Sequence, residues 1–95
     1  MVLCGGKGMT YQQIDSFIRA RDEALEKGTV EDLERFFGLY WSFFDERLLL
    51  TFRKSPRANK EVTLRKMQAN SMGVSPKTRK AARAWLEERG FSTKL

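Results

Sequence analysis

The sequence predicts an all-α protein, because it lacks the patterns of strands and has those of helices. No stretch alternates apolar and polar residues over several positions, as a half-buried strand would, and there is no Asn-Gly or Asp-Gly turn. Residues that start and stop helices recur along the chain, and the apolar residues between them follow steps of three and four. We therefore expect a single domain over residues 9–95 made of four helices. The expected ranges of these helices are 10–27, 30–53, 56–72 and 76–89.

The first two helices have clear start and stop residues. Thr10 followed by Gln13 fits a capping box, in which the two residues exchange hydrogen bonds at the helix N-terminus. Gly28 ends this helix, because glycine readily adopts the left-handed conformation found at helix C-termini. Thr29 caps the second helix, and two acidic residues follow in its first turn, where the helix dipole favours negative charge.

The last two helices are separated by similar signals. A Ser-Pro step at 55–56 interrupts the second helix and allows the third to begin. Gly73 is expected to end the third helix and to permit a tight turn. Ser75 then caps the fourth helix, a proline occupies its first position, and Gly90 ends it.

The second helix is unusually apolar. Thirteen of the 23 residues from Val30 to Phe52 are apolar, which is more than the single stripe that a surface helix needs. Such a helix must be covered on several sides, and we expect a second copy of the chain to cover part of it, giving a homodimer. Gly38, in the middle of this helix, predicts a close helix crossing. The expected interface, with a host protein or a second copy, consists of Phe36, Phe37, Tyr40, Trp41, Phe43, Phe44 and Leu48.

Charge divides the chain into two halves. Residues 1–52 carry six Lys or Arg and nine Asp or Glu, a net charge of −3, whereas residues 53–95 carry twelve and three, a net charge of +9. Nine of the eleven aromatic residues lie in the acidic half, which leaves only Trp85 and Phe91 in the basic half. The net charge of +9 on the basic half attracts polyanions and predicts a nucleic-acid partner, either DNA or RNA.

Composition argues against several classes of function. The chain has no histidine and a single cysteine, Cys4, so the usual general base, a Cys/His metal site and an internal disulfide are all missing. We therefore expect no enzyme activity, no metal and no cofactor. The longest apolar run is three residues, too short to cross a membrane, and the lone cysteine suits the reducing cytoplasm. Residues 1–8 are expected to be a leader or a disordered N-terminus, with Met9 as the natural start.

The segment 69–91 resembles the helix-turn-helix of winged-helix repressors of the gluconate-repressor type. The matching residues are Ala69, Gly73, Val74, Ser75, Thr78, Ala82, Leu86, Glu87, Glu88, Gly90 and Phe91. The segment differs from the family at Gln68, Arg79 and Arg83, which stand where core residues are customary. A bare helix-turn-helix and a capped helical hairpin are therefore both open for this segment.

The resemblance implies a small DNA-binding regulator, and the short chain is typical of one of bacterial, phage or mobile-element origin. In a helix-turn-helix the second helix places its N-terminal residues in the major groove. Lys77, Thr78 and Lys80 would then contact bases, and the remaining cations would contact phosphates. The full expected nucleic-acid surface is Lys77, Thr78, Arg79, Lys80, Arg83, Arg53, Lys54, Arg57, Lys60, Arg65 and Lys66. The alternative function is a phage-encoded helical inhibitor or adaptor that docks on a host protein.

Overall fold

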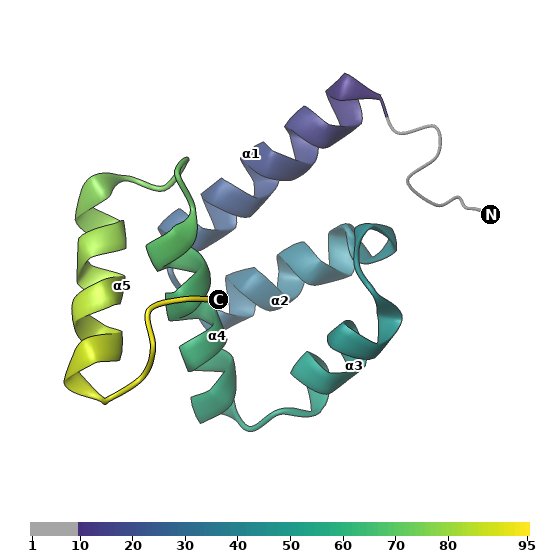
Figure 1. Ribbon diagram of the computed structural model, residues 1–95. Helices are drawn as coiled ribbons and strands as arrows, with labels where there is room; N and C mark the ends of the chain where they lie inside the picture. The colour runs from purple at the N-terminus through teal and green to yellow at the C-terminus, as the bar shows by residue number, and fades with distance from the viewer. Residues whose placement is uncertain (1–9) are drawn as a thin grey trace.

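The computed structural model describes residues 10–95, and this range consists of helices and turns without a strand (Figure 1). The all-α class is therefore confirmed. The elements are α1 (Tyr11–Lys27), α2 (Val30–Leu39), a short 3-10 helix η1 (Trp41–Phe43), α3 (Glu46–Lys54), α4 (Arg57–Asn70) and α5 (Pro76–Glu88). The expected leader, residues 1–8, lies outside the described range.

The predicted caps of α1 and α2 are present. The side-chain oxygen of Thr10 accepts a hydrogen bond from the backbone of Gln13 (3.1 Å), and the Gln13 side chain accepts one from the backbone of Thr10 (2.9 Å). Gly28 ends α1 in the left-handed conformation, with a φ of 77°. The hydroxyl of Thr29 accepts a hydrogen bond from the backbone of Asp32 (3.0 Å) and thus starts α2.

The prediction of one helix over residues 30–53 is wrong. α2 ends at Leu39, η1 follows, and α3 begins after Asp45, whose carboxylate accepts a hydrogen bond from the Arg47 backbone (2.7 Å). The aromatic residues between α2 and α3 lose side-chain freedom in a helix, whereas Asp45 is a favourable cap, so a break here has a low free-energy cost. The prediction of four helices is corrected to five α-helices and η1 within residues 10–95.

The break lets the aromatic segment, residues 36–52, fold back on itself. Phe17 of α1 stacks on Phe43 with their ring centres 4.8 Å apart, and lies 5.4 Å from Phe36. Phe37 meets Phe44 and Phe52 edge to face, at 5.0 and 4.9 Å. Aromatic pairs of this kind contribute about 0.5–1.5 kcal/mol each beyond the area that they bury. The segment therefore covers much of its own apolar surface without a second copy.

A second, smaller core joins α4 and α5, which run in opposite directions side by side (Figure 1). Ala69 of α4 packs there against Ala82 and Leu86 of α5. α5 ends as predicted at Gly90, which has a φ of 76°. The backbone N–H of Phe91 donates to the carbonyl of Leu86 (2.9 Å), which is the hydrogen bond of a Schellman cap.

Two glycines have roles that differ from the predicted ones. Gly73 does not have a positive φ, so the turn does not need its conformational freedom. A Cβ there would instead collide with the carboxylate of Asp22, so the Asp22 side chain is what favours glycine. A Cβ at Gly38 would meet nothing within 4 Å, so the predicted helix crossing at this residue is wrong.

Candidate nucleic-acid interface

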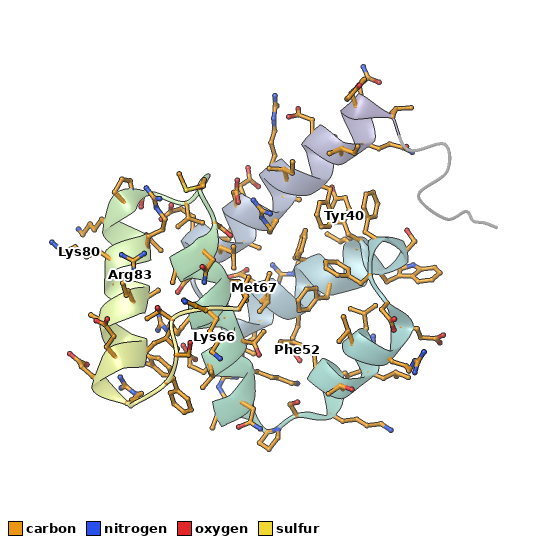
Figure 2. The ribbon with its side chains drawn as sticks, in the orientation of Figure 1. Tyr40, Phe52, Lys66, Met67, Lys80 and Arg83 are labelled. Carbon is orange, nitrogen blue, oxygen red and sulfur yellow. The ribbon has the colours of Figure 1, made fainter. Side chains whose placement is uncertain are left out.

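The exposed side of α5 carries a row of cations. Lys77, Lys80 and Arg83 recur every three residues along the helix and are exposed. None of the three has an ion-pair partner among residues 10–95. Figure 2 shows Lys80 pointing away from the molecule and Arg83 one turn along the same helix. These side chains are available to an external anion, and we call them the α5 cation row.

The position of these charges opposes the helix dipole. Lys77, Arg79 and Lys80 lie in the first half of α5, whose first turn has no acidic residue, and Arg83 lies just past the middle of the helix. Its acidic residues, Glu87 and Glu88, lie instead in its last turn. A cation near a helix N-terminus or an anion near a C-terminus is unfavourable by about 0.3–1 kcal/mol. Helix stability therefore does not explain the cations in the first turn, Lys77 and Arg79.

The N-terminus of α5 is occupied by Glu26 of α1. Its carboxylate accepts hydrogen bonds from the Ser75 backbone (2.7 Å), the Ser75 hydroxyl (3.2 Å) and the Thr78 hydroxyl (2.6 Å). The bond from Thr78, followed by that from the Ser75 backbone, lowers the pKa of Glu26 below its usual value. The Thr78 hydroxyl, which we expected to face bases, is thus engaged within the protein.

Three of the predicted phosphate-binding cations are paired internally. Arg57 bonds to Glu31, and Lys60 bonds to Glu34 (2.6 Å), which ties α4 to α2. The hydrogen bond from Arg57 to Glu31 lowers the pKa of Glu31 and raises the pKa of Arg57. Arg65 forms an ion pair within α4, with Glu61 (2.9 Å).

The other predicted cations lie at different places. Arg53 and Lys54 end α3, which lies across α4 from α5 (Figure 1). Lys66 is half-buried on α4, and Figure 2 shows it on the same side of the α4–α5 pair as Arg83. Arg79 is half-buried, with a guanidinium nitrogen 3.4 Å from the sulfur of Met72. The structure therefore brings together only part of the predicted surface, centred on α5.

Sequence reasoning missed a group of planar side chains at the C-terminal end of α5. The ring of Trp85 lies nearly parallel to that of Phe91, with an interplanar angle of 10° and ring centres 6.5 Å apart. The guanidinium of Arg89 lies 4.1 Å from the centre of the Trp85 ring, and that of Arg65 lies 5.4 Å away. The Gly90 stop was the available signal, because a Schellman cap brings the next residue back onto the helix.

Most of the predicted protein interface is covered. Phe36 is buried, and four of the other six residues are half-buried in the aromatic cluster. Only Trp41 and Leu48 are exposed, with 65% and 68% of their surface accessible. Leu39 and Leu50, which were not predicted, are exposed nearby in the sequence.

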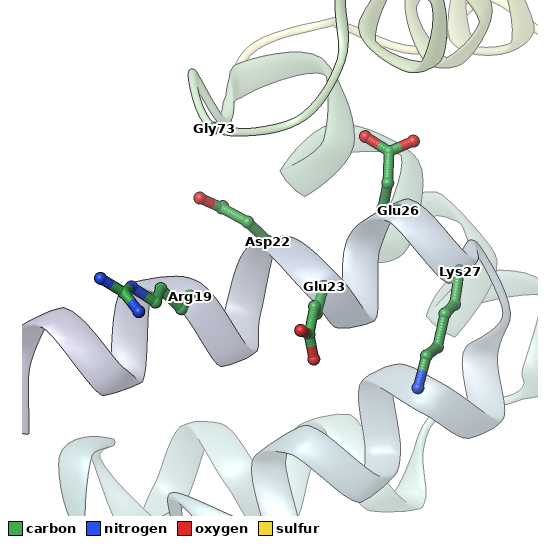
Figure 3. Close-up of a pocket in the computed structure, with 6 residues that line it drawn as sticks. All are labelled: Arg19, Asp22, Glu23, Glu26, Lys27 and Gly73. Carbon is green, nitrogen blue, oxygen red and sulfur yellow. The ribbon is translucent and has the colours of Figure 1, made fainter.

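A hollow between α1 and the α4–α5 turn has mixed charge (Figure 3). It is lined by Arg19, Asp22, Glu23, Glu26, Lys27 and Gly73. No three of the described carboxylates gather as a metal-binding group, and no helix in residues 10–95 is long and apolar enough to cross a membrane.

Comparisons with known proteins assign no family to this chain. No protein-family model matches it, and no match was found among the curated proteins or the solved structures. The resemblance of residues 69–91 to a helix-turn-helix accordingly stays a prediction.

Proposed function

We propose that the protein binds nucleic acid through α5, as a small regulator of bacterial, phage or mobile-element DNA. The observation that carries this proposal is the α5 cation row: three exposed cations without an ion-pair partner in residues 10–95, the first of them in the first turn of α5, where the helix dipole disfavours a cation. Arg79 lies between Lys77 and Lys80 in the sequence of α5 and would add a phosphate contact. RNA is the alternative ligand, since phosphate recognition is common to both.

Salt dependence measures how many of these cations contact phosphates. Each phosphate neutralised on duplex DNA releases counterions, so the logarithm of the binding constant falls with the logarithm of the salt concentration with a slope of about −0.9 per contact. Four contacts, from the row and Arg79, give a slope of about −3.6. For a single strand the slope is about −0.7 per contact.

The test is fluorescence anisotropy with labelled oligonucleotides over a salt series. K80Q/R83Q removes two charges from the row and should reduce the slope by about half. R53Q/K54Q removes the same charge from the end of α3 and should leave the slope unchanged. The proposal is wrong if the protein shows no salt-sensitive binding, or if the α3 variant weakens binding as much as the α5 variant does.

We propose protein association as a second function, favoured by the exposed apolar residues of η1 and α3. No residue of α3 is buried, although Leu48 and Leu50 belong to it. This helix has acidic residues at its N-terminal end and Arg53 and Lys54 at its C-terminal end, so two copies packed antiparallel would bring opposite charges together. A homodimer is therefore the association that we favour over docking on a host protein.

Sedimentation equilibrium at micromolar concentration tests the homodimer. The wild-type protein should have twice the mass of one chain, and W41S/L48S should be a monomer with unchanged helix content. A wild-type protein that is a clean monomer would remove the homodimer and leave a host protein as the partner for this surface.

A further inference from the structure

We infer that the nucleic acid bound by α5 is single-stranded and that one of its bases stacks on Phe91. This inference rests on the proposed function, because it names the form of nucleic acid that the same helix binds. Two features of α5 lead to it: one end of the helix is closed to a DNA groove, and the other end carries flat aromatic and guanidinium groups.

The closed end is the N-terminus. A helix that reads duplex DNA uses its first residues to contact bases in the major groove. In this protein the carboxylate of Glu26 lies at that end, held by Ser75 and Thr78. A carboxylate there repels the phosphates that line a groove, and the first-turn hydroxyl is already engaged. Entry of this helix end into a groove would require the contact between α1 and α5 to break.

The flat groups lie at the C-terminal end of the same helix. Trp85 and Phe91 are the only aromatic residues of the basic half, and the fold brings them together. The Schellman hydrogen bond from Phe91 to Leu86 fixes the backbone that carries the Phe91 ring, and Trp85 lies parallel to that ring. Phe91 is nevertheless 44% exposed, so part of it is open to a ligand.

Aromatic rings and guanidinium planes are the groups on which proteins stack unpaired bases. Bases inside a duplex are already stacked on each other, whereas those of a single strand are free to stack on a side chain. Arg89 lies over Trp85 and is a second planar surface beside the rings. The group therefore fits a single strand better than a duplex.

The spacing along α5 suits a short strand. Lys77 precedes Trp85 by eight residues, which corresponds to about 12 Å along the helix axis. A single strand of a few nucleotides spans this length. The phosphates would contact the N-terminal cations of α5 while a base near the other end stacks on Phe91.

The test compares an oligothymidylate of about 12 nucleotides with a duplex of the same length, within the range of known site sizes. Binding is followed by anisotropy and by the fluorescence of Trp85 in a W41F background, in which Trp85 is the only tryptophan. We expect the single strand to bind several-fold more tightly than the duplex and to quench Trp85. F91L keeps an apolar side chain but removes the flat ring, and it should weaken single-strand binding by about 10-fold.

Controls separate this inference from the proposed function. F91L should unfold cooperatively with a melting temperature no more than about 10 °C below that of the wild type, because it loses one aromatic pair. K80Q/R83Q should weaken binding of both ligands. Absence of binding to any nucleic acid would overturn the proposed function and this inference together. Duplex binding as tight as single-strand binding, or an F91L variant that binds the single strand like the wild type, would overturn this inference alone.

Discussion

The buried glutamine of α4 gives the sharpest prediction about stability. Gln68 is 1% exposed, and its side-chain nitrogen donates a hydrogen bond to the backbone carbonyl of Leu25 (2.8 Å). That carbonyl belongs to the last turn of α1, where carbonyls have no partner within the helix. We predict that Q68M, which preserves the length of the side chain but removes the donor, leaves this carbonyl without its partner.

The magnitude follows from the burial of the group. A buried polar group that loses its only partner destabilises a protein by about 1–3 kcal/mol. Methionine fills nearly the same space, so little is added for a cavity. For a domain of this size, a loss of about 2 kcal/mol corresponds to a fall of about 8–16 °C in the melting temperature.

Urea unfolding followed by circular dichroism measures this change, with Q12M as the matched control. Gln12 is exposed on α1, so the same substitution there should change the free energy of unfolding by less than about 0.5 kcal/mol. The slope of the free energy of unfolding against urea concentration should be equal in the wild type, Q68M and Q12M. The reasoning is refuted if Q68M is as stable as Q12M.

Three further predictions concern other contacts. G38A should stabilise the protein by about 0.5–1 kcal/mol in the same urea assay, because Gly38 is helical and the added Cβ meets nothing; a loss of stability would contradict this. G73A should lower the melting temperature, since the Cβ collides with Asp22, and D22A/G73A should recover part of that loss. The lowered pKa of Glu26 means that its stabilising effect is present above its usual pKa of 4.5 and is lost as the pH falls below it. The stability of E26Q should therefore change less between pH 6 and pH 3 than that of the wild type, and parallel profiles would exclude this role.

Local signals predicted the ends of most helices. Thr10, Gly28, Thr29 and Gly90 act through hydrogen bonds or backbone conformations within a few residues of themselves, so they can be recognised in the sequence. The break after Leu39 was missed because the apolar steps of three and four continue through it. The acidic pair at 45–46 after an aromatic run was the signal for a new helix start, of the same kind as the one recognised at Thr29.

Contacts between distant residues explain why the predicted site was too broad. The two ion pairs from α4 to α2 each join residues 26 positions apart, so the sequence could not show that Arg57 and Lys60 are already paired. The contact of Glu26 with Thr78 spans 52 positions and depends on how α1 crosses the α4–α5 turn. Helix periodicity, by contrast, sufficed to place Lys77, Lys80 and Arg83 on one exposed side of α5.

The most direct test of the central claim is to map the nucleic-acid contact residue by residue. Backbone amide chemical shifts of the full chain would be recorded by nuclear magnetic resonance during titration with oligothymidylate and with duplex DNA. The α5 cation row predicts the largest changes over residues 77–84, with Phe91 added for the single strand. Changes confined to residues 41–54, or no change at saturating oligonucleotide, would contradict the claim that α5 binds nucleic acid.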